Sequence, residues 1–189
     1  MKEFDSLRET CLGSETIFDG VVLHVRKDTV RLPNGKPAVR EYLRHGGAVC
    51  IVPLLNDGRV LLEHQFRYPF DAVLTEIPDG KLNSPDEDPE EAARRELREE
   101  TGAVAGELIF LGDFYAACAY SSENIKMYLA RDIHFEQQAL DEDEFLNVFS
   151  MPLSELVERI AAGEIPDAKT QAAVLRAWLW LNQKKEMGT

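Results

Sequence analysis

Three carboxylates between Gly80 and Gly102 constrain this chain more than any other feature of its sequence. Glu96, Glu99 and Glu100 are three and four residues apart, and side chains at those spacings on an α-helix share one face, about 5–6 Å from one another. Their mutual repulsion calls for a cation. Mg²⁺ suits such a face because it prefers carboxylate oxygens and keeps waters and substrate phosphates as its remaining ligands. The alternative interpretation is a solvated acidic helix face.

The residues around these carboxylates predict the helix independently. Asp88 has the side chain of an N-cap, Pro89 occupies the first helical position, and Glu91 places an acid in the first turn, where it complements the helix dipole. Gly102 fits the left-handed position that ends a helix. We therefore expect a helix from Pro89 to the residue before Gly102.

This segment resembles the Nudix box, G-x5-E-x7-R-E-U-x-E-E-x-G-U, in which U is aliphatic. The match falls on Gly80, Glu87, Arg95, Glu96, Leu97, Glu99, Glu100 and Gly102. Six residues instead of five separate the first glycine from the first glutamate, and Ala103 takes the last aliphatic place. We place the extra residue in the loop 83–86, where an insertion costs little and leaves the helix in register.

The resemblance extends over nearly the whole chain to the ADP-ribose pyrophosphatase branch of the Nudix family. Short similar segments, such as Q-F-R-Y-P, E-I-P-D-G-K and D-A-K-T, surround the box in the order of that branch. They lie at residues 32–36, 40–49, 65–69, 76–81, 141–145 and 167–170. The resemblance implies an α/β fold, the Nudix α/β/α sandwich with a mixed β-sheet, preceded by an N-terminal β-hairpin extension.

The resemblance also implies a metal site on the helix. Glu96 and Glu100 are the expected ligands of Mg²⁺, or of Mn²⁺ in its place, and Glu99 contributes directly or through water. A backbone carbonyl just before the box glycine completes the set, and here it belongs to Asp79, where the family usually has alanine. Arg95 is expected to hold a neighbouring carboxylate in a bidentate pair; the alternative is a surface helix cation.

A late acidic loop supplies the proton acceptor in this branch, and residues 141–144 take its place here. By order and spacing, Glu142 is expected to be the general base and Glu144 a further ligand of the metal or of water. An ordinary acidic turn is the alternative. If Glu142 is not the base, Glu99 or Glu144 is next in line.

Substrate contacts are expected from Arg67, which would meet a phosphate, and from Glu76, which would accept bonds from sugar hydroxyls or brace the box loop. Arg40 and Lys81 are further sources of positive charge, and Tyr120 would stack on a base or pack in the core. The main departure from the branch is Cys118-Ala119, where a proline-glycine pair is usual. That departure bears on ADP-ribose as the substrate and leaves the reaction class unchanged.

Composition narrows the class of protein. A formal net charge of −13 argues against nucleic-acid binding, which requires a basic surface. The first residues carry no apolar segment and no stretch has transmembrane length, so we expect a cytoplasmic protein with no membrane partner. Its three cysteines have no C-x-x-C spacing, so neither a disulfide framework nor a zinc site is expected. Cys50, inside an apolar run, is expected in a buried strand.

The pattern of apolar runs and turn residues predicts the order of elements. We expect a hairpin of strands 16–32 and 36–44, a hairpin of strands 47–55 and 59–66, a strand 72–77, the box helix, strands 107–115, 125–130 and 144–150, and helices 153–162 and 168–183. Leu175, Trp178 and Leu179 form an apolar stripe expected in the core. Residues 1–45 are expected to be a β extension that dimerises, and 46–189 the Nudix domain.

These observations predict a Mg²⁺-dependent hydrolase that cleaves the pyrophosphate bond of ADP-ribose or a related nucleoside diphosphate sugar, giving a nucleoside monophosphate and a sugar phosphate. The resemblance implies a homodimer in which the N-terminal extension packs on a second subunit; a hairpin that folds on its own subunit is the alternative. Another nucleotide sugar such as GDP-mannose is the alternative substrate. From a different class of protein, a nucleotide-sensing module without turnover would keep the same fold, although it would not need every carboxylate of the box.

Overall fold

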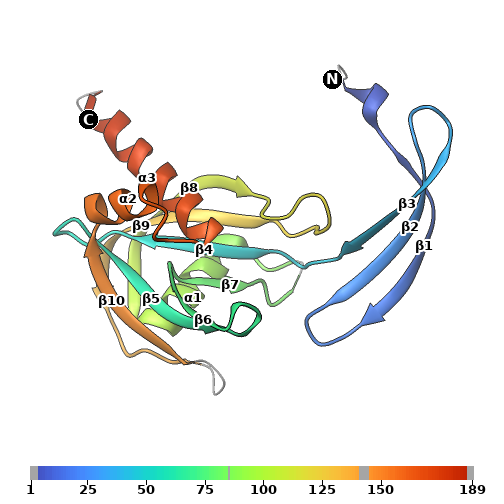
Figure 1. Cartoon of the computed structure of the whole chain (residues 1–189). Coiled ribbons are helices and arrows are strands. Elements are labelled where there is room, and N and C mark those ends of the chain that lie inside the picture. The colour runs from blue at the N-terminus through green and yellow to red at the C-terminus, as the bar shows by residue number, and fades with distance from the viewer. Residues whose placement is uncertain (1–3, 85, 141–144, 187–189) are drawn as a thin grey trace. The chain divides into compact units, whose positions relative to one another are not determined.

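The computed structural model describes residues 4–84, 86–140 and 145–186 of the chain. It divides into two compact units (Figure 1). Unit 1 comprises the residues up to Gly46 together with Tyr115–Glu123, and unit 2 comprises Gly47–Phe114 together with the residues from Asn124 onward. Residues 115–123 thus belong to the same unit as the N-terminal residues. A division of the chain at residue 45 alone does not include them.

Unit 1 is an antiparallel sheet of three strands in the order β1-β2-β3, preceded by the 3-10 turn η1 (Asp5–Leu7). The strands are β1 (Thr10–Asp19), β2 (His24–Arg31) and β3 (Pro37–Leu43). The expected single strand 16–32 is therefore wrong, because the chain reverses where the amide of Gly20 donates to the carbonyl of Leu23 at 2.9 Å. Val21 and Val22 hide this turn in the sequence, since valine favours strands. The turn expected between residues 32 and 36 is present at Pro33-Asn34-Gly35, with Gly35 at φ 82°.

Unit 2 contains two sheets. A mixed sheet has the order β7-β4-β9-β8, with β4 and β9 parallel, and an antiparallel sheet has the order β10-β5-β6. The bounds are β4 (Ala48–Pro53), β5 (Arg59–Arg67), β6 (Ala72–Glu76), β7 (Asp79–Lys81), β8 (Ala103–Phe114), β9 (Ile125–Phe135) and β10 (Leu146–Pro152), with the 3-10 turn η2 (Tyr68–Phe70) after β5. β8 and β9 are longer than their apolar runs, because their outer halves pair with each other to Ala103↔Phe135.

Helices cover the mixed sheet on both faces, which explains why β4 is apolar without interruption. Alternate residues of β4 point to opposite faces: Cys50 and Val52 join a core with α2 (Leu153–Ala161) and α3 (Ala168–Glu186), whereas Val49 and Ile51 join a core with α1 (Pro89–Thr101). Cys50 is fully buried in its strand, as expected. The predicted α/β/α arrangement is confirmed (Figure 1).

The expected stripe on α3 is only partly right. Leu175 and Leu179 are 38% and 59% exposed, while Ala173, Val174 and Ala177 are fully buried. The buried face of the helix is therefore rotated away from Leu175 and Leu179: of the stripe only Trp178 packs against this core, together with Trp180 and Leu181. No helix in the described part of the chain is both long and apolar enough to cross a membrane.

Candidate active site

Helix α1 forms as the sequence predicts, and its packing decides which carboxylates reach the site. The Asp88 side chain accepts from the amide of Glu90 at 2.7 Å, and Gly102 ends the helix in the left-handed region at φ 71°. Ala92, Ala93 and Leu97 are fully buried against the sheets. Because these apolar residues fix the rotation of the helix, the face with the acids turns toward β7, which is one of the strands that α1 contacts.

Two of the box glutamates meet the backbone of β7. Oε2 of Glu100 accepts a hydrogen bond from the amide of Asp79 at 3.0 Å, and the Glu100 side chain is almost fully buried. The Glu96 carboxylate lies where a Cβ on Gly80 would be. Any residue larger than glycine at position 80 would displace Glu96, so the box glycine is needed for close approach of helix and strand.

Arg95 is shared among three carboxylates. Its Nε and Nη2 face Oε1 of Glu87 at 3.3 and 3.2 Å, and its Nη1 faces Glu96 at 2.8 Å and Glu99 at 3.2 Å. Its Nη2 also donates to the carbonyl of Lys81 at 3.2 Å. The guanidinium therefore offsets the repulsion between these acids and fixes their orientation, and Glu87 remains in contact with it despite the extra residue in the preceding loop.

The donor set suits a hard divalent cation. Within residues 4–84, 86–140 and 145–186, no three side chains of His, Cys, Asp or Glu form a ready metal cluster. The structure instead brings the carboxylates of Glu96 and Glu100 to the backbone of Asp79 and Gly80. Carboxylate and carbonyl oxygens are the donors that Mg²⁺ prefers, and Mg²⁺ typically uses few protein ligands and keeps water at the rest.

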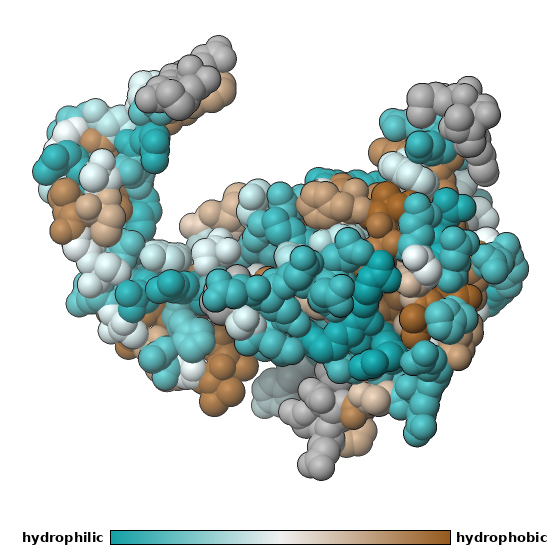
Figure 2. All heavy atoms as spheres, turned by 180° about the vertical axis from the view of Figure 1, so that it is seen from behind, coloured by the Kyte–Doolittle hydropathy of each residue, from teal (hydrophilic) through white to brown (hydrophobic). Residues whose placement is uncertain are grey.

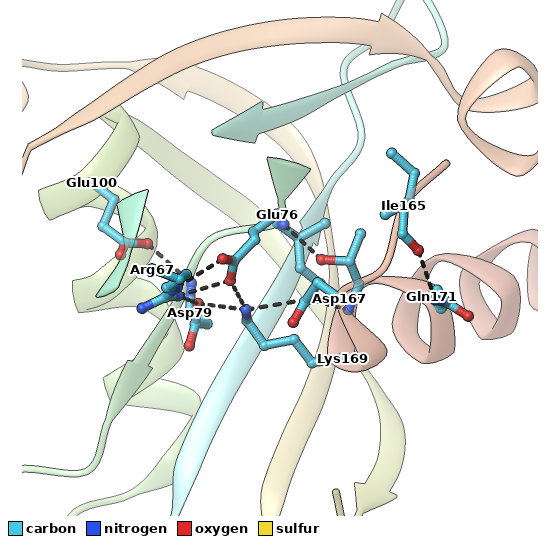
Figure 3. A network of polar contacts seen from close by, with 10 residues as sticks. Arg67, Glu76, Asp79, Glu100, Ile165, Asp167, Lys169 and Gln171 are labelled. Atoms are coloured by element: carbon cyan, nitrogen blue, oxygen red, sulfur yellow. Dashed lines mark hydrogen bonds and ion pairs between the residues drawn. The ribbon is translucent and has the colours of Figure 1, made fainter. Parts of the chain in front are cut away.

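A buried ion network adjoins this strand (Figure 3). Nε and Nη2 of Arg67 donate to the two oxygens of Glu76, each at 2.7 Å, and Nη2 also reaches Oδ1 of Asp79 at 3.3 Å. Lys169 contacts both acids as well. Burial alone would raise the pKa of Glu76, but the hydrogen bond from Arg67 and the charge of Lys169 outweigh it, so this pKa is lowered. Glu76 is therefore a carboxylate at neutral pH.

Glu63 is a second buried acid on the same face. It pairs with Glu76 across β5 and β6, it is fully buried, and neither of its carboxyl oxygens has a hydrogen-bond partner among the described residues. Burial first, and then the negative charge of Asp79, raise the pKa of Glu63 to about 8. The Glu63 carboxyl is thus mainly protonated at neutral pH, which avoids a further unpaired charge in the interior.

This shift makes the stability of the fold depend on pH. In the unfolded chain a glutamate has a pKa of about 4.3, whereas in the folded chain the pKa of Glu63 is about 8. The folded state therefore holds the proton more tightly, and the contribution of Glu63 to stability falls as pH rises from about 4.3 through 8. We expect the melting temperature of Glu63→Gln minus that of the wild type to increase over this window, measured by calorimetry. Glu91→Gln, at an exposed position, should show no such trend. A difference between Glu63→Gln and the wild type that stays constant with pH would contradict the prediction.

The remaining predicted residues fall into three groups. Arg40 and Tyr120 line one hollow of about 210 Å³ within unit 1, where Arg40 is paired with Glu9 and Tyr120 is 59% exposed. Lys81 is exposed on β7. Glu142 and Glu144 lie outside the described residues.

Sequence reasoning missed two residues of this region. Lys169 belongs to the segment D-A-K-T, whose resemblance to the branch assigns no role to the lysine itself, and no motif marks Glu63. The signal for Glu63 was weak, because this acid follows the apolar run Val60-Leu61-Leu62 and precedes two further polar residues. For Lys169 the signal was weak, since a lysine in the first turn of a helix is usually solvated.

Comparisons with known proteins agree along most of the chain. Residues 44–176 match the NUDIX domain, and residues 9–43 match the nucleoside diphosphate sugar hydrolase N-terminal domain. The chain is 37% identical over 171 residues to the ADP-ribose pyrophosphatase of Bacillus subtilis, covering 89% of this chain and 92% of the relative. It is 37% identical over 168 residues to the methanol dehydrogenase activator of Bacillus methanolicus, covering 88% and 90%. A crystal structure of an ADP compounds hydrolase superposes with a TM-score of 0.83 at 27% identity, covering 94% and 96%.

Proposed function

Because this chain belongs to the Nudix family, we propose that it is an enzyme that hydrolyses the pyrophosphate bond of ADP-ribose or a related nucleoside diphosphate sugar. The products are a nucleoside monophosphate and a sugar phosphate. The observation that carries this proposal is the meeting of the Glu96 and Glu100 carboxylates with the backbone of Asp79 and Gly80. Relatives named for ADP-ribose and for ADP compounds support the substrate class.

In this proposal Glu96, Glu100 and the carbonyl of Asp79 hold Mg²⁺, with Glu99 and Glu144 as further donors. Mn²⁺ is the alternative ion. When bound, the cation supplies neutralisation of the phosphate oxygens and lowers the pKa of water. The residues of the chain do the rest: Arg95 keeps Glu87, Glu96 and Glu99 in place.

Proton transfer is assigned to the late acidic loop. Glu142 accepts the proton of the attacking water as general base, a role that a positioned carboxylate can fill once the water is acidified. Arg67 is assigned to a phosphate of the substrate, because its side chain is 34% exposed while its buried edge is held by Glu76. A net charge of −13 would otherwise repel an anionic substrate, so such local positive charge is required.

The proposed function is tested by release of nucleoside monophosphate from a panel of ADP-ribose, other ADP-sugars and GDP-mannose, with Mg²⁺ and with a chelator. We expect turnover of ADP-ribose that the chelator abolishes. GDP-mannose as the best substrate would favour the alternative that Cys118-Ala119 motivates, since these residues replace the usual proline-glycine pair. Binding without turnover of any compound would instead support a nucleotide-sensing module.

We also propose that residues 1–45 form a dimerisation extension of the Nudix domain at 46–189. All ten residues of β1 are exposed, and Leu12, Ile17 and Phe18 are each about half exposed; brown surface on the β1–β3 sheet is visible in Figure 2. Such apolar side chains on a thin sheet favour coverage by a second copy of the chain.

The three cysteines are free, which agrees with a reducing, cytoplasmic location.

The dimer gives a direct expectation for the mass in solution. Light scattering at assay concentration should yield twice the chain mass of 21.3 kDa. Ile17→Glu, which places a charge on this sheet, should shift the protein toward the monomer, whereas Glu15→Gln on the same strand should not. A fully active wild-type monomer at that concentration would contradict the dimer.

A further inference from the structure

Lys169 is a buried cation that the proposed chemistry does not use. It lies in the first turn of α3, is 8% exposed, and its Nζ contacts carboxylates of three residues (Figure 3). The partners are Glu76, Asp79 at 3.1 Å and Asp167 at 3.2 Å. Burial alone would lower the pKa of Lys169, but the surrounding carboxylates, Asp79 first, raise it overall. Lys169 is therefore charged when it contacts them.

Glu76 is held between two cations that differ in their access to solvent. The exposed fractions of the side chains are 34% for Arg67, 1% for Glu76 and 9% for Lys169. The Nε and Nη2 edge of Arg67 is used by Glu76. Its Nη1 makes no hydrogen bond within the described part of the chain, so this edge of the planar guanidinium is available to an anion.

We propose that Lys169 is a positioning residue: it holds Glu76 from the buried side so that Arg67 presents Nη1 to a phosphate of the substrate. This inference rests on the proposed function. It assigns a role in substrate binding to the first turn of α3, 93 residues away in sequence from Glu76.

The charges explain why a cation is needed at position 169. Without Lys169, the carboxylates of Glu76 and Asp79 would share Arg67 alone, and Nη2 of Arg67 is already 3.3 Å from Asp79. The guanidinium would be drawn further between the two acids, and a phosphate would compete with both for it. A buried carboxylate that loses one of its partners also loses its fixed orientation, and the bidentate geometry of Arg67 depends on that orientation.

The test compares Lys169→Met with Thr170→Val in steady-state kinetics on the best substrate of the panel. Thr170 is fully buried on the same helical turn and its Oγ1 accepts from the amide of Ile77 at 3.0 Å, so its loss perturbs the same junction without touching Glu76. We expect Lys169→Met to raise KM by about 10-fold or more, with a smaller change in kcat, because misplaced binding groups weaken substrate contacts. Thr170→Val should lower the melting temperature and leave KM unchanged.

A double-mutant cycle shows whether Lys169 acts through Arg67. In an Arg67→Gln background, Lys169→Met should raise KM little further, because the group that it positions is gone. Metal-free calorimetry with AMP should give the same pattern in Kd. If Lys169→Met does not fold, Lys169→Gln replaces it, because glutamine keeps a polar group at this buried position. It lacks the charge, so KM should again rise.

The inference is overturned by a wild-type KM in the folded variant, by an equal rise of KM in Thr170→Val, by an undiminished effect in the Arg67→Gln background, or by failure of both Lys169 variants to fold, which would indicate a purely structural residue. The kinetic outcomes among these require an active wild-type enzyme. If the wild type neither binds nor hydrolyses any compound of the panel, the proposed function itself has failed.

Discussion

Glu100→Gln is expected to reduce kcat/KM by at least about 100-fold, since residues that only support a metal ligand already cost 10–100-fold when lost. The substitution removes the charge of an almost fully buried carboxylate on α1. It keeps the side-chain shape, and the amide oxygen can still accept the hydrogen bond from Asp79. The melting temperature should therefore change little while the metal site loses a charged donor.

The measurement pairs kinetics with direct binding of Mn²⁺ followed by calorimetry. Glu100→Gln should weaken Mn²⁺ binding as well as turnover, whereas Glu91→Gln, exposed on the first turn of the same helix, should match the wild type in both. Wild-type turnover in Glu100→Gln would rule out the metal role proposed for this residue.

Glu142→Gln is expected to lower kcat by about 10²–10⁴-fold with little change in substrate affinity, which is the usual contribution of positioned proton transfer. Amide and carboxylate are nearly the same size, but only the carboxylate accepts the proton of the attacking water. The pH profile of kcat for this variant should also lack the rise that ionisation of the general base produces in the wild type.

The neighbouring acid provides the matched control. Glu144→Gln should act through the metal site, so excess Mg²⁺ should partly restore its rate, while the rate of Glu142→Gln should stay low at any concentration of Mg²⁺. Should Glu142→Gln keep nearly full kcat at saturating metal and substrate, the base is a different acid, with Glu99 or Glu144 tested next.

Local sequence determined the elements that carry the chemistry. The cap at Asp88, the stop at Gly102 and the spacing of Glu96, Glu99 and Glu100 depend on backbone geometry within one or two turns, and all are present in α1. The alternation along β4 likewise follows from residues next to one another. These features were predictable because neighbours in the chain decide them.

Contacts between distant residues could be found only in the folded chain. Glu63 and Lys169 face Glu76 and Asp79 because β5, β6, β7 and the start of α3 converge, and no local pattern encodes that convergence. The exposure of Leu175 and Leu179 was also decided by packing, since α3 turns Ala173, Val174 and Ala177 toward the core instead. The sequence by itself thus determined the family, the box helix and the acids on its face. Tertiary structure decided which cations and carboxylates surround them, because burial and charge pairing depend on every element that meets at the site.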